Sequence, residues 1–243
     1  WVNETGAGLD QGETKYTPVP GTAALRQAVS DKFKRENDLH YAPAQIVVST
    51  GAKQSLANLA LAMLNEGDEV VILAPFWVSY SAIVEVAGGV PITVGAGIED
   101  DYKVSAEAIE AAITDKTKFI LFSSPCNPTG SVYTKDELAA IAKMLGKYPN
   151  VYVVADEIYE HINFTGKHAS IGTMPEVKDR TITVNGFSKG FAMTGWRLGY
   201  IGAPLEIAKA CTKLQGQSTS GANSIAQAAG AHALNTSLKP TEE

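Results

Sequence analysis

The chain has 243 residues, of which 45% are hydrophobic and 19% are charged, and its formal net charge at pH 7 is -6. This composition is typical of a globular protein with a sizeable core, and the negative charge argues against nucleic acids and anionic membranes as partners. No apolar run is long enough to span a membrane. The two cysteines, Cys126 and Cys211, lie far apart and predict no disulfide framework. We therefore expect a cytoplasmic protein, and we assign no metal ligands.

Helical and extended patterns alternate along the chain. Residues 6–20, rich in Gly, Thr and Pro, are predicted to form a loop. After it we expect, in chain order, a helix at 22–33, a strand at 46–48, a helix at 51–64, a strand at 69–73, a helix at 81–87, a strand at 90–94, a helix at 105–113, a strand at 119–122, a helix at 134–145, strands at 151–155, 181–184 and 198–201, a helix at 205–214, a polar loop at 215–223 and a helix from 224 onward. This alternation predicts an α/β fold with a mostly parallel central sheet flanked by helices.

Local signals support three of the helix starts. Thr22 and Ser105 are predicted N-caps, and Thr134 with Glu137 matches the pattern of a capping box. His161 and His168 fall between predicted elements, where we expect them to be solvated, and they receive no role.

Four side chains of unusual character follow apolar strands: Trp77, Asn127, Asp156 and Lys189. Each has an ordinary structural explanation when it is taken alone, namely a core tryptophan, an Asx turn, an ion pair and a lysine extended toward solvent. The carboxyl ends of parallel strands, however, meet at one edge of a sheet, where α/β proteins bind ligands. Their common position therefore predicts one shared site.

The chemistry of this site follows from its residue types. A desolvated lysine such as Lys189 is a nucleophile that forms a Schiff base with a carbonyl compound. Gly51, at the entry to a predicted helix, lets backbone N–H groups approach an anion, and Arg197 can clamp a phosphate. Together with the Asp156 carboxylate, this set suits pyridoxal 5′-phosphate, which needs a lysine, an acid near its pyridine nitrogen and a phosphate site.

The motif around Lys189 resembles the cofactor-lysine motif of class I and II aminotransferases. It consists of Ser188-Lys189 followed by Met193-Thr194-Gly195-Trp196-Arg197-Leu198-Gly199-Tyr200, and it is most similar to the bacterial aspartate aminotransferases of subgroup Ib. The supporting motifs occur in the family's order: Tyr16-Thr17-Pro18, Gly51-Ala52-Lys53-Gln54, Asn127-Pro128-Thr129-Gly130 and Asp156-Glu157-Ile158-Tyr159. The resemblance covers nearly the whole chain from about Thr14 onward.

The resemblance implies a role for each residue that would contact the cofactor ring. Lys189 would hold pyridoxal phosphate as a Schiff base and shuttle the proton of the substrate's α-carbon. Asp156 would keep the pyridine nitrogen protonated, and Tyr159 with Asn127 would bind the 3-hydroxyl oxygen. Trp77 would stack on the ring, and both Trp77 and Asn127 would also contact the substrate.

The resemblance further implies a phosphate site and a shared dimeric site. Gly51 and the backbone amides of Ala52 and Lys53 would bind the phosphate together with Arg197. Tyr16 would reach the phosphate held by a neighbouring subunit, so that a homodimer shares its active sites. The Lys53 side chain would recognise the distal carboxylate of a substrate.

The chain departs from the family's pattern in two respects. Many relatives carry a serine at the position of Gly186, so one phosphate-binding hydroxyl is missing. The implied domains are an arm remnant at 1–20, a large cofactor-binding domain at 21–235, and at 236–243 the start of a link to a small domain that is largely missing. We therefore expect a fragment of a longer enzyme.

The implied activity is a ping-pong transfer of an amino group from an amino acid, with aspartate or glutamate preferred, to a 2-oxo acid. An aromatic or prephenate aminotransferase is an alternative with the same cofactor, as is a lyase or synthase of this fold. A third hypothesis is a cofactor-binding module, or a truncated chain without activity of its own.

Overall fold

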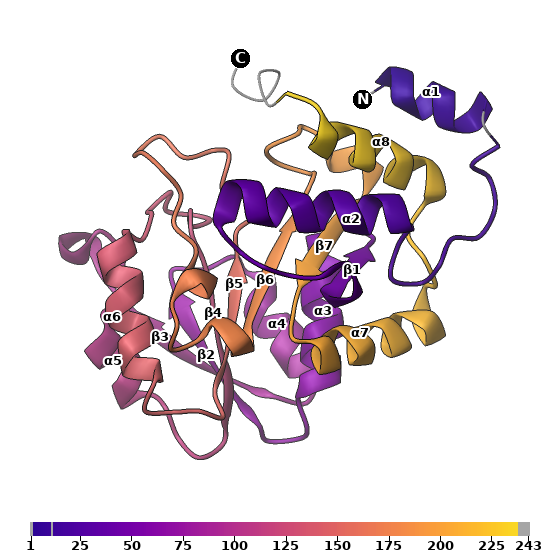
Figure 1. Ribbon diagram of the computed structural model, residues 1–243. Helices are drawn as coiled ribbons and strands as arrows, with labels where there is room; N and C mark the ends of the chain where they lie inside the picture. The colour runs from indigo at the N-terminus through magenta and orange to yellow at the C-terminus, as the bar shows by residue number, and fades with distance from the viewer. Residues whose placement is uncertain (1, 11, 238–243) are drawn as a thin grey trace. The chain divides into compact units, whose positions relative to one another are not determined.

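The computed structural model describes residues 2–10 and 12–237. Its strands are β1 (Ile46–Ser49), β2 (Glu69–Ala74), β3 (Val90–Gly95), β4 (Thr117–Ser123), β5 (Tyr152–Asp156), β6 (Thr181–Gly186) and β7 (Gly199–Gly202). Its α-helices are α1 (Val2–Asp10), α2 (Ala23–Lys32), α3 (Ala52–Met63), α4 (Ser79–Val86), α5 (Ala106–Ala111), α6 (Lys135–Leu145), α7 (Leu205–Ser218) and α8 (Ser224–Asn235) (Figure 1). No helix among the described residues is of a length and apolarity that could cross a lipid bilayer.

The chain divides into two compact units. Unit 1 combines residues 1–58 with 184–243, and unit 2 is Leu59–Thr183. With β6, which passes from unit 2 into unit 1, the strands make a mixed, mostly parallel seven-stranded sheet flanked by helices, which confirms the predicted fold class. The expected domain limits near residues 20 and 235 remain a prediction, and residues 238–243 of the expected link lie outside the described part of the chain.

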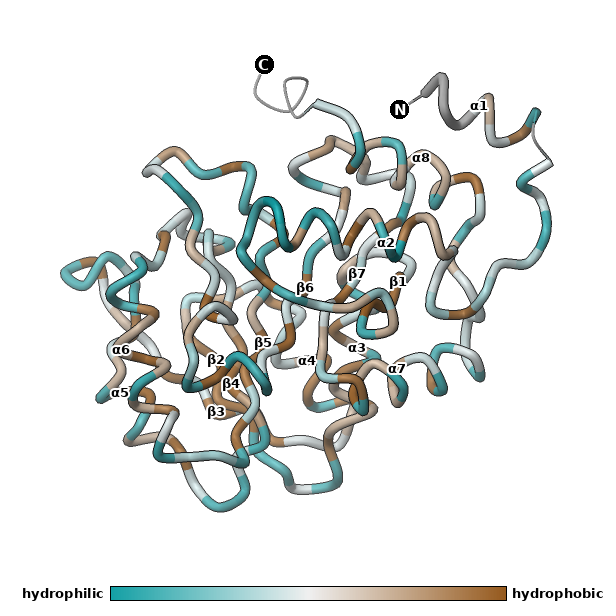
Figure 2. The backbone as a smooth tube through the Cα atoms, viewed as in Figure 1, coloured by the Kyte–Doolittle hydropathy of each residue, from teal (hydrophilic) through white to brown (hydrophobic). Residues whose placement is uncertain are grey.

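In unit 2, the strands β3, β2, β4 and β5 pair in parallel. Val71, Ile120 and Val153 are partners in register across three of these strands, so they lie on the same face of the sheet. They form one hydrophobic core with Leu138 and Ile141 of α6. Figure 2 shows the hydrophobic colour concentrated along these strands, as expected for strands that are buried on both faces.

In unit 1, β1 and β7 pair in the antiparallel direction. Val48 of β1 and Tyr200 of β7 lie in a core with Leu25 and Val29 of α2 and with Ala229 of α8. The apolar residues that predicted helix α2 therefore lie on the face that the helix buries. The antiparallel pairing was not anticipated from the alternation of strands and helices.

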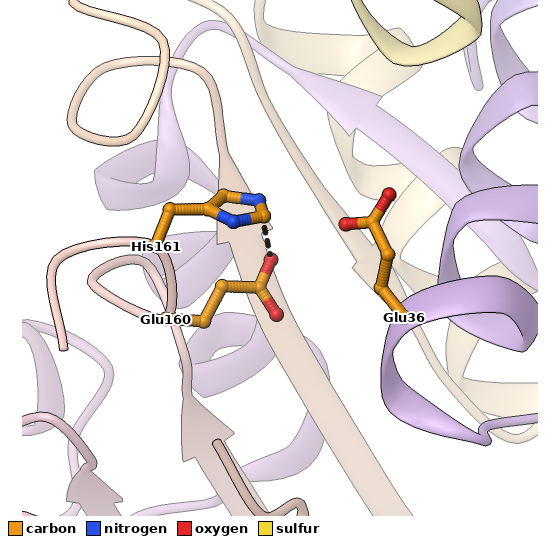
Figure 3. A group of neighbouring side chains, drawn as sticks. All are labelled: Glu36, Glu160 and His161. Atoms are coloured by element: carbon orange, nitrogen blue, oxygen red, sulfur yellow. Dashed lines mark ion pairs between the residues drawn. The ribbon is translucent and has the colours of Figure 1, made fainter. Parts of the chain in front are cut away.

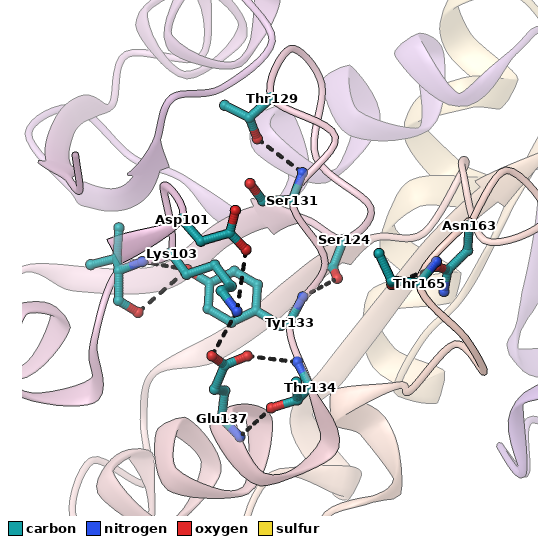
Figure 4. Close-up of polar contacts among 11 residues, drawn as sticks. Asp101, Lys103, Ser124, Thr129, Ser131, Tyr133, Thr134, Glu137, Asn163 and Thr165 are labelled. Carbon is teal, nitrogen blue, oxygen red and sulfur yellow. Dashed lines mark hydrogen bonds and ion pairs between the residues drawn. The ribbon is translucent and has the colours of Figure 1, made fainter. Parts of the chain in front are cut away.

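The predicted helix caps are confirmed. The Thr22 hydroxyl accepts from the N–H of Leu25 at 3.3 Å, and the Ser105 hydroxyl accepts from that of Ala108 at 3.2 Å. Thr134 and Glu137 form a reciprocal capping box, in which each side chain accepts from the other residue's backbone N–H (Figure 4).

Two predicted loops are wrong in part. Residues 6–10 belong to α1, which packs against α8, where Gly8 is buried close to Ala228. Helix α7 continues to Ser218 although its last turns are polar, because Gln215 is buried there and its amide bonds to other backbone groups of unit 1. In both cases packing against another helix or loop outweighs local propensity.

Candidate active site

The carboxylate of Asp156 lies buried at the carboxyl end of β5, where only 4% of the residue is exposed. The Tyr80 hydroxyl donates to its Oδ2 at 2.7 Å, and the backbone N–H of Ile158 donates to its Oδ1 at 3.2 Å. Burial raises the pKa of Asp156 to about 6, although these two hydrogen bonds act in the opposite direction. The site therefore holds an ionised acid in an environment that resists ionisation.

Tyr80 is a site residue that the sequence reasoning missed. It is 1% exposed and lies on α4, three residues after Trp77, and the two rings meet edge to face with centroids 5.8 Å apart. Burial raises the pKa of Tyr80 well above its usual value, so its hydroxyl stays protonated as a donor to Asp156. Its position three residues after Trp77, a predicted site residue at the end of a strand, is the signal that could have identified it.

The structure brings Asn127 and Tyr159 together, as expected. The Asn127 side-chain amide donates to the Tyr159 hydroxyl at 3.3 Å, and both residues are half-buried. Asn127 follows β4 and Tyr159 follows β5, and these two strands are parallel neighbours. Trp77, also half-buried, follows β2, the next strand across from β4. Unit 2 thus presents its predicted site residues after the carboxyl ends of three adjacent strands.

In unit 1, Arg197 lies against the turn that begins α3. Gly51, at a φ of +84°, precedes Ala52, the first residue of this helix, and a Cβ on Gly51 would collide with the Arg197 guanidinium. A Cβ on Gly199 would likewise collide with the backbone of Gly51 and Ala52. The guanidinium donates to the Thr194 carbonyl at 2.8 Å, which leaves further N–H groups of its fork for an anion.

This arrangement joins a cation to the amino terminus of a helix of 12 residues, where exposed N–H groups and the helix dipole both favour an anion. The turn itself is held by Ser49, whose hydroxyl donates to the Gly51 carbonyl at 3.1 Å and lies 2.5 Å from that of Ser55. A cavity of about 670 Å³, lined in part by Thr50 and Arg197, opens beside it. Unit 1 therefore has the groups that can bind a phosphate-sized anion, and their use as a phosphate site stays a prediction.

Lys189 lies in the turn after β6, and in sequence it falls between two buried phenylalanines, Phe187 and Phe191, whose rings contact each other. The ring centroids of Phe187 and Phe191 are 5.4 Å apart, and the Ala192 N–H donates to the Lys189 carbonyl at 3.0 Å. The Lys189 side chain itself is exposed. Its aromatic neighbours Phe187 and Phe191 pack into the core of unit 1 and leave Lys189 exposed, and the expected desolvation of its amine stays a prediction.

The other predicted residues of unit 1 are also placed. Lys53 is exposed in the first turn of α3, and Tyr16 is exposed over 101% of its reference area. Gly186 is the last residue of β6 and is buried. Trp77, Asn127, Asp156 and Tyr159 belong to unit 2, whereas the lysines, Arg197 and Tyr16 belong to unit 1. Their assembly into a single site remains a prediction.

His161 and His168 are not solvated, contrary to expectation. His161 Nε2 lies 3.4 Å from a carboxylate oxygen of Glu160 (Figure 3), and His168 Nε2 lies 3.0 Å from one of Glu157. Both glutamates are buried. Glu157, Glu160 and His168 could each offer a metal ion one ligand atom, with these atoms within 4.8 Å of one another, but Glu157 already pairs with His168 and accepts from the Ser170 hydroxyl.

The chain is similar to known proteins over most of its length. The profile of the family described as aminotransferase class I and II matches residues 2–243. The aspartate/prephenate aminotransferase of Nitrosomonas europaea is 50% identical over 229 residues, which are 93% of this chain and 58% of that protein.

Solved structures are similar over almost the entire chain. The aspartate aminotransferase of Rhizobium meliloti superimposes with a TM-score of 0.97 at 41% identity, over 99% of this chain and 60% of the other. An aromatic aminotransferase of Pyrococcus horikoshii superimposes with a TM-score of 0.95 at 38% identity, over 99% and 65%. The chain thus spans about 60% of the length of these similar proteins.

Proposed function

The chain belongs to the class I and II aminotransferase family, and on that premise we propose that the protein moves an amino group from an amino acid to a 2-oxo acid. Aspartate or glutamate is the preferred donor, and the transfer occurs in two half-reactions of a ping-pong cycle. The family depends on pyridoxal 5′-phosphate. When bound, this cofactor supplies an aldehyde that condenses with amines and a protonated ring that accepts electrons from the substrate's α-carbon.

The observation that carries the proposal is the buried Asp156 carboxylate. A buried acid with a raised pKa is costly to the fold, and a pyridinium nitrogen is a cation that would offset this cost by pairing with it. The anion site formed by Gly51, Ala52 and Arg197 in unit 1 fits the phosphate of the same cofactor. The residues present therefore match the two charged ends of pyridoxal phosphate.

In this proposal the residues of unit 2 bind and orient the ring. Asp156 holds a proton on the pyridine nitrogen, and Tyr80 fixes the rotation of that carboxylate by its hydrogen bond to Oδ2. Asn127 and Tyr159, which bond to each other, provide donors for the 3-hydroxyl oxygen. Trp77 provides a flat surface on which the ring stacks, and its side chain is held edge-on by Tyr80.

The residues of unit 1 anchor the phosphate and transfer the proton. Arg197 and the first N–H groups of α3 bind phosphate oxygens. Lys189 would hold the cofactor through its Nζ, and the same amine would take up the proton that leaves the substrate's α-carbon. Lys189 is exposed, so a substrate that arrives from solvent can reach this residue.

Lys53 supports a preference for substrates with a second carboxylate. It is exposed in the first turn of α3, next to the proposed phosphate site, where a cationic side chain attracts a further acidic group. Prephenate is the alternative acceptor that a specific observation favours, because similar proteins are named aspartate/prephenate aminotransferases. Prephenate also carries two carboxylates, so the same lysine suits either substrate.

We also propose that the protein works as a homodimer with shared sites. A tyrosine exposed over its entire side chain, as Tyr16 is, gains a hydrogen-bond partner and loses solvent only when another molecule covers it. Its hydroxyl would then contact the phosphate bound by the neighbouring subunit.

Borohydride reduction followed by peptide mapping tests the cofactor assignment. Purified protein is incubated with pyridoxal phosphate, reduced and digested, and the expected adduct is on Lys189. Lys189→Ala should lose it, whereas Lys53→Ala should keep it and lose selectivity for aspartate and glutamate over aromatic amino acids. An adduct on any other lysine, or transaminase activity retained by Lys189→Ala, would overturn the assignment.

A further inference from the structure

The segment that carries Tyr16 is held by the side-chain amide of Gln227. Gln227 lies on α8, is 0% exposed, and forms hydrogen bonds through both N–H groups and the oxygen of its amide. Its Nε2 donates to the Thr17 hydroxyl at 3.0 Å and to the Ala222 carbonyl at 2.7 Å, and its Oε1 accepts from the Thr22 N–H at 2.8 Å. One buried amide thus binds the chain on both sides of the turn at Pro18.

A second buried amide holds the rest of this segment. Gln215 of α7, also 0% exposed, donates through Nε2 to the carbonyls of Val19 and Val48, both at 2.9 Å. Its Oε1 accepts from the Asn58 side chain at 3.0 Å. The Pro20 carbonyl then accepts from the Val48 N–H at 3.0 Å. The backbone from Thr17 to Thr22 is therefore fixed to unit 1 at several points.

Neighbouring residues also lie close to this segment. A Cβ on Gly221 would collide with the Thr17 hydroxyl, and a Cβ on Gly21 would lie within 3.0 Å of the Val48 side chain. Tyr16 precedes this clamped stretch, and its ring is fully exposed. Packing within the chain therefore cannot orient the ring, and its position depends on the backbone that Gln227 holds.

We propose that Gln227 is a positioning residue for Tyr16: it fixes the Thr17–Thr22 turn so that the Tyr16 hydroxyl reaches the phosphate site of a second copy of this chain. This inference rests on the proposed function, in which Tyr16 binds the neighbouring subunit's phosphate. Gln227 itself takes no part in proton transfer or covalent catalysis, because its side-chain amide is neutral and buried. Its contribution is to the geometry of another residue.

The test is a double-mutant cycle on cofactor affinity, measured by titrating the purified cofactor-free protein with pyridoxal phosphate. Tyr16→Phe removes one charge-assisted hydrogen bond to phosphate and should weaken binding about 10-fold. Gln227→Leu, which keeps the side chain's size, should weaken binding by a similar factor. The double variant should bind no more weakly than either single one, because Gln227 acts through Tyr16.

A second pair of variants covers the case in which Gln227→Leu does not fold. Thr17→Val removes only the hydroxyl that accepts from Gln227, whereas Thr17→Ser keeps it, so Thr17→Val should weaken binding and Thr17→Ser should not. Gln45→Leu is the matched control, because Gln45 also bonds through both ends of its amide, to Ala42 and Ala203, but does not contact this segment. It should leave cofactor affinity unchanged.

Hydrogen exchange of the peptide covering residues 12–22, in the absence of cofactor, gives an independent readout. Exchange should accelerate in Gln227→Leu and Thr17→Val and stay at the wild-type rate in Thr17→Ser and Gln45→Leu. Additive losses of affinity in the cycle, or variants of Gln227 and Thr17 that bind normally while Tyr16→Phe is impaired, would overturn the positioning role. Absence of cofactor binding by the wild-type protein would instead refute the proposed function.

Discussion

Replacing Asp156 by asparagine should stabilise the cofactor-free protein at neutral and alkaline pH. Asparagine has the size of the protonated acid and carries no charge, and the Tyr80 hydroxyl can rotate to accept from its amide. Burial raises the pKa of Asp156 from 3.8 to about 6, so ionising this group in the folded protein is less favourable than in the unfolded chain. At about 1.4 kcal/mol per pKa unit, the ionised acid lowers the free energy of unfolding by ~3 kcal/mol.

The sign of the pH dependence follows from proton binding. Because the folded-state pKa is higher, the folded protein binds more protons than the unfolded chain between about pH 4 and pH 6, and stability falls as the pH rises through this interval. The asparagine variant lacks this loss. Its advantage over wild type should therefore be close to zero below about pH 4 and reach ~2–3 kcal/mol above about pH 7.

Urea unfolding of both proteins at about pH 4 and at about pH 8, in the same buffers, measures this difference. Cofactor affinity and transaminase activity should change in the opposite direction, because asparagine cannot hold a proton on the pyridine nitrogen. A stability difference that is the same at both pH values, or an asparagine variant that is less stable at the higher pH, would refute the assignment of Asp156 as a functional acid held at the expense of stability.

Tyr80→Phe is the companion variant, because it removes the hydroxyl that donates a hydrogen bond to the Asp156 carboxylate. The Tyr80 hydroxyl lowers the pKa of Asp156, so its removal should raise this pKa above its present value of about 6. A hydrogen bond to a charged group contributes about 1.5 kcal/mol or more, which corresponds to a further rise of roughly one pKa unit. The pH profile of cofactor affinity should move upward by that amount, and an unchanged profile would show that Tyr80 does not act through Asp156.

Two further predictions concern unit 1 and unit 2 separately. Gly51→Ala should weaken phosphate and cofactor binding more than 10-fold in a calorimetric titration, because the added Cβ collides with the Arg197 guanidinium. Gly67→Ala is the control for backbone strain, because Gly67 has a φ of +83° and open space around it. This variant should bind normally in the same titration. Arg180→Leu should lower the free energy of unfolding by about 2–4 kcal/mol, since the guanidinium donates to four backbone carbonyls, one of them at the last residue of α6. Urea unfolding measures this loss, and a decrease under 1 kcal/mol would contradict it.

The sequence predicted most elements of the fold because their signals are local. Apolar runs of strand length, such as 69–73 and 151–155, and caps such as Thr134 depend on neighbours within a few residues. The errors occur where a distant partner determines the conformation. Helix α1 forms from a Gly-containing stretch because it packs on α8, and α7 is extended because Gln215 bonds to the backbone of a loop about 200 residues away in sequence.

The residue types of the candidate site could be predicted from sequence, since a lysine, an acid, an arginine and a glycine turn each have chemistry that depends on identity and order. The environment of these residues could not be predicted from sequence. Only the tertiary structure shows that Tyr80 bonds to Asp156, that Lys189 is exposed, and that His161 and His168 lie beside buried glutamates. Burial and hydrogen bonding arise between residues far apart in the chain, and these contacts, more than identity, set the pKa and accessibility of a side chain.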